Sequence, residues 1–324
     1  MGIEAFSLAM LCRAKAGGAT FGTTITLGRQ RISMLPAELD AALRLLGRPA
    51  DTARPWGPGV PSFAEDLLPH LLGIARLVSV DNSAYEGASV VHDMNVPIPD
   101  AHVGIYDAVI DGGTLEHVFN VAVAMANAMR LLRVGGRVFS LTPANNHCGH
   151  GFYQFSPELF FRVFAPENGF EIEHLLAIEH PFPGLELSTR RTVYEVRDPA
   201  IVGDRVGLVN DRPVYLFVQA VKREAVEPFA ATPQQSDYVA AWSGRRDGAS
   251  SGSTARQSST IRSGLIGEVC KSKFGRTNFC QSACQPLMSA SHACVLALAL
   301  RRSSSASNCR KKVRASASRP MSGG

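Results

Sequence analysis

Three acidic residues follow short apolar runs that have the composition of buried strands. Asp81 closes Leu77–Val80, Asp93 follows Ala88–His92, and Asp111 closes Tyr106–Ile110. In a parallel sheet the carboxyl ends of the strands share one edge, and ligands bind there. An acid after the second strand can accept both hydroxyls of a ribose, and one after the third can accept from an adenine amine. The three acids therefore predict an adenosine-shaped site, unless each one only ends its strand in a turn.

A polar and aromatic loop at 145–155, NNHCGHGFYQF, follows a further apolar run. His150 is our candidate general base because glycines flank it, and Asn145 and Tyr153 are candidates for positioning a substrate. The structural alternative is that the histidines satisfy loop backbone groups and that the aromatic residues anchor the core. His147, Cys148 and His150 lack a further ligand at convincing spacing, so the sequence predicts no metal site.

Two further polar residues, Glu116 and His117, open a helix shortly after Asp111. Their position on the same sheet edge makes them candidates for substrate binding. An acid in the first turn of a helix is also favoured by the helix dipole alone, which would explain Glu116 without a function.

The stretch from Tyr106 to Pro143 holds the elements that must position these groups. A strand at 106–111 precedes a helix at 121–132 with helical spacing of apolar residues, the turn Gly135-Gly136, and a second strand at 137–141. A strand-helix-strand unit of this kind predicts a parallel sheet that is covered on both faces.

The remaining pattern alternates strands and helices, which predicts an α/β fold with a mostly parallel, doubly wound, Rossmann-like sheet. A helical insertion at about 31–76 would interrupt it, and a hairpin turning at Asn210-Asp211 would end it. The other expected elements are strands at 21–27, 77–80, 88–92, 170–178 and 214–221, and helices at 4–15, 36–46, 62–73 and 157–164.

Charge divides the chain into two parts of different character. Residues 244–324 hold 14 Lys and Arg against 2 Asp and Glu, a net charge of +12, whereas residues 1–243 hold 19 against 26, a net charge of −7. The second part is rich in Ser, Arg, Ala and Gly and has too little apolar surface to offset chain entropy. We therefore predict a domain at 1–243 and a disordered tail at 244–324, which binds nucleic acid or is unselected sequence.

No run of residues reaches the 18 or more apolar positions of a membrane span, and the N-terminus lacks the early basic residues of a signal peptide. Only Cys12 and Cys148 precede the tail, which fits a reducing compartment. We expect a cytoplasmic protein with a small-molecule substrate and no membrane partner.

Residues 21 to about 222 resemble class I S-adenosylmethionine-dependent methyltransferases of the small-molecule type. The resemblance lies in YDAVID at 106–111, TLEHV at 114–118 and LLRVGGR at 131–137. It implies a seven-stranded sheet ending in an antiparallel hairpin, with S-adenosylmethionine as cofactor. It also implies that Asp81 meets the ribose, that Asp93 and Met94 lie against the adenine, and that the loop Asp111, Gly112 and Thr114 flanks the methionine portion.

The first strand departs from the pattern of that family. An acid and a glycine-rich loop are expected after it, but Gly28-Arg29-Gln30 stand there. Gly28 can still make the tight turn, while Arg29 would meet the cofactor's carboxylate and Gln30 would hydrogen-bond to it.

The sequence therefore predicts methyl transfer to a small-molecule or sugar-like acceptor. The alternative is a non-catalytic binding module that has kept the fold and lost the cofactor. A nicotinamide-dependent oxidoreductase is disfavoured, because no G-x-G-x-x-G follows the first strand.

Overall fold

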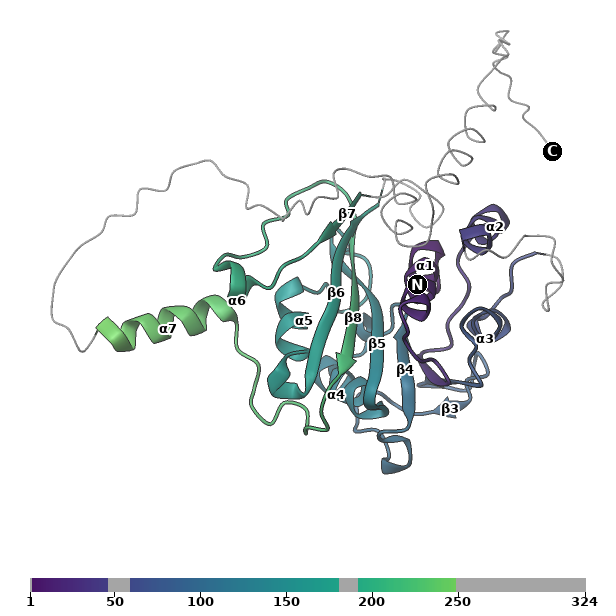
Figure 1. The fold of residues 1–324 in the computed structure, drawn as a ribbon, viewed down its shortest axis with the longest axis horizontal. Coiled ribbons are helices and arrows are strands. Elements are labelled where there is room, and N and C mark those ends of the chain that lie inside the picture. The colour runs from purple at the N-terminus through teal and green to yellow at the C-terminus, as the bar shows by residue number, and fades with distance from the viewer. Residues whose placement is uncertain (1, 46–58, 181–191, 249–324) are drawn as a thin grey trace, which may run out of the picture. The chain divides into compact units, whose positions relative to one another are not determined.

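The computed structural model describes residues 2–45, 59–180 and 192–248, and within them the chain forms a single eight-stranded sheet flanked by helices (Figure 1). The strand order is β3-β2-β1-β4-β5-β8-β6-β7. The strands are β1 (Thr23–Leu27), β2 (Arg76–Asp81), β3 (Val90–Val91), β4 (Tyr106–Asp111), β5 (Leu132–Asn145), β6 (Phe170–Glu179), β7 (Thr192–Glu195) and β8 (Val214–Lys222).

The half of the sheet that carries the acidic strand ends is parallel. β1 pairs with β2 on one side and with β4 on the other, so that Leu27 lies beside both Val80 and Asp111. β3 adds to β2, and β5 adds to β4, in the same direction. This arrangement confirms the α/β fold class and brings the carboxyl ends of β1, β2 and β4 to one edge.

The other half of the sheet is antiparallel and differs in detail from the expectation. β8 pairs antiparallel with both β5 and β6, and not with residues 204–209, which form no strand. The antiparallel end of the sheet is confirmed. The expected turn at Asn210-Asp211 is wrong, because β8 inserts between two strands that precede it by dozens of residues. β7 pairs antiparallel with β6 and adds an eighth strand at the edge.

Two hydrophobic cores lie on opposite faces of the sheet. One packs α4 (Val121–Leu131) and α5 (Pro157–Val163) against residues such as Val109 and Val218. The other packs α1 (Ala5–Ala16), α2 (Pro36–Leu45) and α3 (Leu68–Leu72) against residues such as Ile110 and Phe217. Because adjacent positions on β4 and β8 face opposite cores, these strands are buried on both sides.

Further helical elements connect or follow these strands and helices. They are the single 3₁₀ turns η1 (Ala64–Asp66), η2 (Asp100–His102), η3 (Leu115–His117) and η4 (Pro166–Asn168), the short helix α6 (Pro199–Val202) and the longer helix α7 (Ser236–Gly248). The expected helix at 62–73 is thus η1 followed by α3. The boundary that we predict at 243/244 falls within α7, and the rest of the tail lies outside the described residues. None of the described helices is both long and apolar enough to cross a bilayer.

Candidate functional site

The carboxyl ends of three neighbouring strands converge on Gly28, directly after β1. Gly28 has φ +70°, and its N–H donates to the carbonyl of Val80 at 2.7 Å. A Cβ at this position would come within 2.7 Å of Thr114 Oγ1 and 3.8 Å of Asp81 Oδ2. Both the left-handed backbone and the close neighbours therefore require glycine here, as the sequence predicted for a tight turn.

Asp81 stands beside this turn at the end of β2. It is partly exposed, and its Oδ2 accepts the backbone N–H of Arg29 at 3.3 Å. Its backbone carbonyl accepts the N–H of His92, which fixes the end of β3 next to it. A carboxylate held this way at the strand edge is suited to accept hydroxyl groups from a ligand.

Arg29 does not point freely over the edge. Its guanidinium pairs with Glu65 at 3.1 Å, contacts the carbonyl of Glu86, and lies 4.0 Å from the ring centre of Phe63. Arg31 lies over the same ring and pairs with Glu86 at 2.6 Å. The segment around η1 is thereby fixed to the loop after β2.

Gln30 fills the space beside the β4 loop. Its side chain is buried, and its amide nitrogen donates to the carbonyl of Leu27 and lies 3.4 Å from Thr114 Oγ1. A Cβ on Gly112 would lie only 2.3 Å from Gln30 Oε1, an oxygen that has no hydrogen-bond partner among the described residues. The Gln30 amide therefore occupies the gap between the β1 turn and the β4 loop.

Asp111 holds the β4 loop in place. It is buried, accepts the hydroxyl of Ser140 at 2.6 Å and the N–H of Thr114 at 2.8 Å, and its burial raises the pKa of the carboxyl group. Thr114 in turn donates its hydroxyl to the carbonyl of Leu27 at 2.7 Å, which ties β4 to β1.

Asp93 and Met94 follow β3. Asp93 is exposed and accepts both the backbone and side-chain N–H groups of Asn95, and the backbone hydrogen bond holds the pKa of this carboxyl below its usual value. Met94 is buried in the core beneath α4. The structure therefore places Asp93 in a turn at the surface and Met94 in the core next to it.

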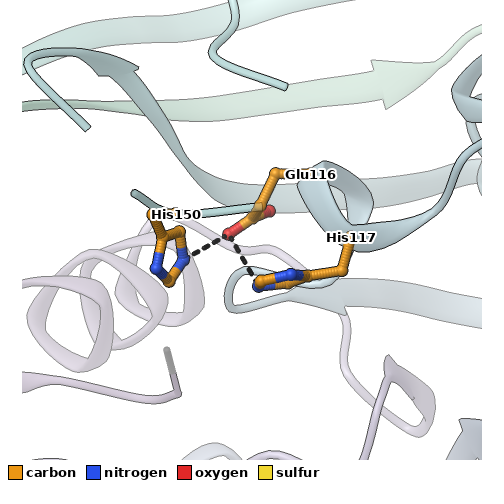
Figure 2. A group of neighbouring side chains, drawn as sticks. All are labelled: Glu116, His117 and His150. Carbon is orange, nitrogen blue, oxygen red and sulfur yellow. Dashed lines mark hydrogen bonds and ion pairs between the residues drawn. The ribbon is translucent and has the colours of Figure 1, made fainter. Parts of the chain in front are cut away.

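A second cluster of polar side chains joins Glu116, His117 and His150 (Figure 2). Glu116 Oε1 lies 3.3 Å from Nε2 of His150 and 3.9 Å from Nε2 of His117. The Glu116 oxygen and one ring nitrogen from each histidine all lie within 4.8 Å of one another. Glu116 is fully buried, whereas the side chain of His117 is 48% exposed and that of His150 is 32% exposed. The cluster therefore opens to solvent on the histidine side.

Burial dominates the electrostatics of this cluster. It raises the pKa of Glu116 to about 8, with a further contribution from the nearby Asp111 carboxylate. The second oxygen of Glu116, Oε2, is buried without a hydrogen-bond partner in the described part of the chain. Burial also lowers the pKa of His117. The cluster is therefore an acceptor-rich site that favours added protons or cations.

The backbone of the 147–152 loop brings His150 to Glu116. Gly151 has φ +69°, and a Cβ there would lie 2.8 Å from the carbonyl oxygen of Glu116. The same carbonyl accepts the N–H of Phe152 at 2.7 Å, and His150 N–H donates to the carbonyl of His147. Burial, with neighbouring His150 and His180, lowers the pKa of His147 to about 4. His147 is thus neutral near pH 7 and packs 4.3 Å from the Tyr215 ring centre.

The two other expected substrate residues differ in placement. Tyr153 donates its hydroxyl to the carbonyl of Phe119 at 2.6 Å, next to the exposed edge-to-face pair Phe119 and Phe152. Asn145 is turned toward the loop before β8, where it donates to Asn210 at 3.1 Å. Tyr153 therefore supports an aromatic rim two residues beyond each histidine of the cluster, while Asn145 braces the antiparallel half.

The sequence predicted that Glu116, His117 and His150 lie at one edge of the sheet, but it did not predict that they contact one another. The contact depends on the turn at Gly151, for which the glycines flanking His150 were the available signal. The sequence also offered no sign that Phe63, Glu65 and Glu86 hold Arg29. The first two lie in the insertion and Glu86 lies in the loop after β2, and neither segment carries a recognisable motif.

A groove at another place in the fold lies between α5, α6 and α7, lined by residues such as Glu158, Arg162 and Asp237. Its lining residues include none from the strand edge described above. It does not contribute to this site.

No protein-family model and no curated protein matches the chain. Among solved structures, it is similar to a branched-chain polyamine synthase mutein from Thermus thermophilus with 5′-methylthioadenosine, at 15% identity and TM-score 0.33, over 71% of this chain and 58% of that one. It is also similar to the 1,6-didemethyltoxoflavin N1-methyltransferase of Burkholderia thailandensis with S-adenosylhomocysteine, at 13% identity and TM-score 0.35, over 68% and 79%. A third is an S-adenosylmethionine-dependent methyltransferase of Thermotoga maritima, a possible histamine N-methyltransferase, at 14% identity and TM-score 0.35, over 68% and 90%. Similarities this weak assign no ligand or activity to the present chain.

Proposed function

We propose that this chain is an S-adenosylmethionine-dependent methyltransferase that acts on a small-molecule or sugar-like acceptor. The observation that carries the proposal is the convergence of β1, β2 and β4 on Gly28, with the Asp81 carboxylate beside the turn. The arrangement provides an acceptor for ribose hydroxyls at the strand edge, where α/β folds bind ligands.

The cofactor would supply a methyl group activated by a positively charged sulfur. Asp81 would bind the ribose, and Gly28 would allow the backbone to approach. Asp93 and Met94 are our candidates for the adenine side. Gly112, Asp111 and Thr114 would border the methionine portion. Arg29 would bind its carboxylate after exchanging Glu65 for that ligand, and Gln30 would hydrogen-bond to it.

The acceptor would bind where Glu116, His117 and His150 open to solvent, between the strand edge and the aromatic rim. That rim consists of Phe119 and Phe152, and Tyr153 supports it. His150 is the candidate that takes the acceptor's proton at Nδ1, because its Nε2 faces Glu116 Oε1 at 3.3 Å and this contact orients the ring. Alignment of the two reactants and exclusion of water would supply much of the rate enhancement.

Isothermal titration of the full chain with S-adenosylhomocysteine tests cofactor binding. Asp81→Asn keeps the shape of the side chain and removes its charge, so it should weaken binding about 10- to 100-fold through the lost charged hydrogen bonds. Asp100→Asn is the matched control, because Asp100 is an exposed acid in η2. The affinity of this variant for S-adenosylhomocysteine should equal that of the unmodified chain.

A second candidate is a binding module without methyl transfer. The specific observation in its favour is that Gln30 fills the gap beside Gly112 while Glu65 and Phe63 hold Arg29. This candidate predicts no heat with S-adenosylhomocysteine at roughly millimolar concentration in a protein that is folded by circular dichroism. Measurable heat that Asp81→Asn reduces and Asp100→Asn does not would reject it.

A further inference from the structure

The cluster of Glu116, His117 and His150 has the composition of a transition-metal site. It presents two imidazole nitrogens and one carboxylate oxygen, a donor set that first-row divalent ions accept while keeping positions open for another ligand. Hard ions such as Mg²⁺ prefer oxygen donors and are disfavoured by the two imidazoles.

The distances leave space for an ion without rebuilding the loop. Metal bonds of about 2.0–2.1 Å in a tetrahedral site separate ligand atoms by roughly 3.4 Å. Glu116 Oε1 already lies 3.3 Å from His150 Nε2 and 3.9 Å from His117 Nε2. Figure 2 shows both imidazoles turned toward the same oxygen. The His117 side chain is half exposed and can close the remaining gap by a change of rotamer.

An independent observation concerns the second oxygen of the Glu116 carboxyl group. Glu116 is fully buried, yet its Oε2 has no hydrogen-bond donor in the described part of the chain. A buried polar atom without a partner is costly, and a cation that displaces the proton of this carboxyl group offsets the cost of burying its charge. Gly151 lets the loop approach the Glu116 backbone, so that the carbonyl of Glu116 accepts the N–H of Phe152. This hydrogen bond keeps the neighbouring His150 close to Glu116.

We propose that Glu116, His117 and His150 bind a first-row divalent transition-metal ion, which in turn binds the acceptor through an oxygen atom. The role of the ion rests on the proposed methyl transfer, whereas ion binding itself does not. The ion would take over the role assigned to His150, by attracting the acceptor's oxygen and favouring its deprotonated form. The O–H bond breaks with the electron pair left on oxygen, and the proton passes to water. The acceptor class is therefore an alcohol or phenol rather than an amine.

Titration of the metal-free full chain with Co²⁺ tests the proposal, because the visible d–d spectrum reports the ligands directly. We expect one tightly bound ion with a spectrum of nitrogen and oxygen donors. His117→Ala and His150→Ala should each weaken that binding by about 100-fold or more, beyond the 10- to 100-fold effect of losing an outer-sphere partner. His70→Ala in α3 is the matched control and should bind like the unmodified chain.

Cysteines in the tail are shared by all variants, and thiolate binding would add a charge-transfer band in the near ultraviolet that the histidine variants leave unchanged. The proposal is overturned if the unmodified chain and His117→Ala bind Co²⁺ equally, or if all bound ion shows thiolate donors. His117 is half exposed, so this variant remains informative even if substitution of buried Glu116 prevents folding. S-adenosylhomocysteine binding is measured without metal, so either proposal can fail alone.

Discussion

At the scale of single residues, the acids at the strand ends have separate tasks. Asp111 is buried and braced by Ser140 and Thr114, so it holds the loop, whereas Asp81 stays partly exposed beside Gly28. The sequence predicted that both would lie at one sheet edge. It could not distinguish their tasks, because the distinction depends on the β4–β5 register, which places Ser140 next to Asp111.

Two hydroxyl groups on β5 offer a matched test of that bracing. Ser140→Ala should lower the free energy of unfolding by about 1–3 kcal/mol, because Asp111 Oδ2 loses its donor. Thr142→Val, two residues along, should be neutral or stabilising, because Thr142 Oγ1 is buried without a partner in the described residues. Urea unfolding of both variants measures the difference, and equal losses would contradict the assigned role of Ser140.

His174 on β6 should give the protein an acid-sensitive stability. Burial, aided by the charge of Arg13, lowers its pKa in the folded state below the ordinary value of 6.5. The unfolded chain therefore binds the proton more tightly, so this contribution is complete above pH 6.5 and is lost as the pH falls. Chemical unfolding from pH 7 to 5 should show a smaller decline for His174→Gln. An unchanged slope would show that His174 titrates normally.

At the scale of elements, the parallel half of the sheet and the antiparallel strands that end it were predictable, but the pairing within the antiparallel half was not. The strands at 77–80, 106–111 and 137–141 follow from short apolar runs separated by a helical pattern. β8 was found, but its partners were misassigned, since an apolar strand buried on both faces gives no sign of its neighbours. β7 and α7 have weak patterns and were missed.

Lys222 connects the end of β8 to the end of α4. It is buried, which lowers its pKa, and its ammonium donates to the carbonyls of Met129 and Leu132 at 2.9 Å each. Lys222→Met should therefore destabilise the fold by about 1–3 kcal/mol by leaving those carbonyls without donors. Arg223→Met, at the exposed neighbouring position, should change stability by less than about 0.5 kcal/mol. Thermal unfolding of the pair decides, and equal effects would contradict a capping role.

At the scale of the whole molecule, residues 1–243 carry a net charge of −7 and residues 244–324 a net charge of +12, and all proposed site residues lie between Gly28 and Tyr153. The division into a domain and a tail stays a prediction from this composition. The sequence could not predict how the insertion at about 31–76 meets the site, because Arg29 finds Glu65 and Phe63 only in the folded chain.

Deletion of residues 249–324 should leave the affinity for S-adenosylhomocysteine unchanged, because α7 is retained and no proposed site residue is removed. If the tail binds nucleic acid, the same deletion should abolish binding that weakens steeply with salt. Isothermal titration and fluorescence anisotropy at several salt concentrations measure the two effects. A deletion that lowers cofactor affinity would show that the tail contributes to the site.

The strand edge at Gly28 and Asp81 is the proposed site of an adenosine-bearing cofactor, and a crystal structure of the full chain with S-adenosylhomocysteine would show the ligand there. We expect the ribose hydroxyls on the Asp81 carboxylate, with Arg29 released from Glu65 and turned to the ligand's carboxylate. A ligand bound elsewhere, or an edge still closed by Gln30 and Arg29 at saturating ligand, would contradict this proposal.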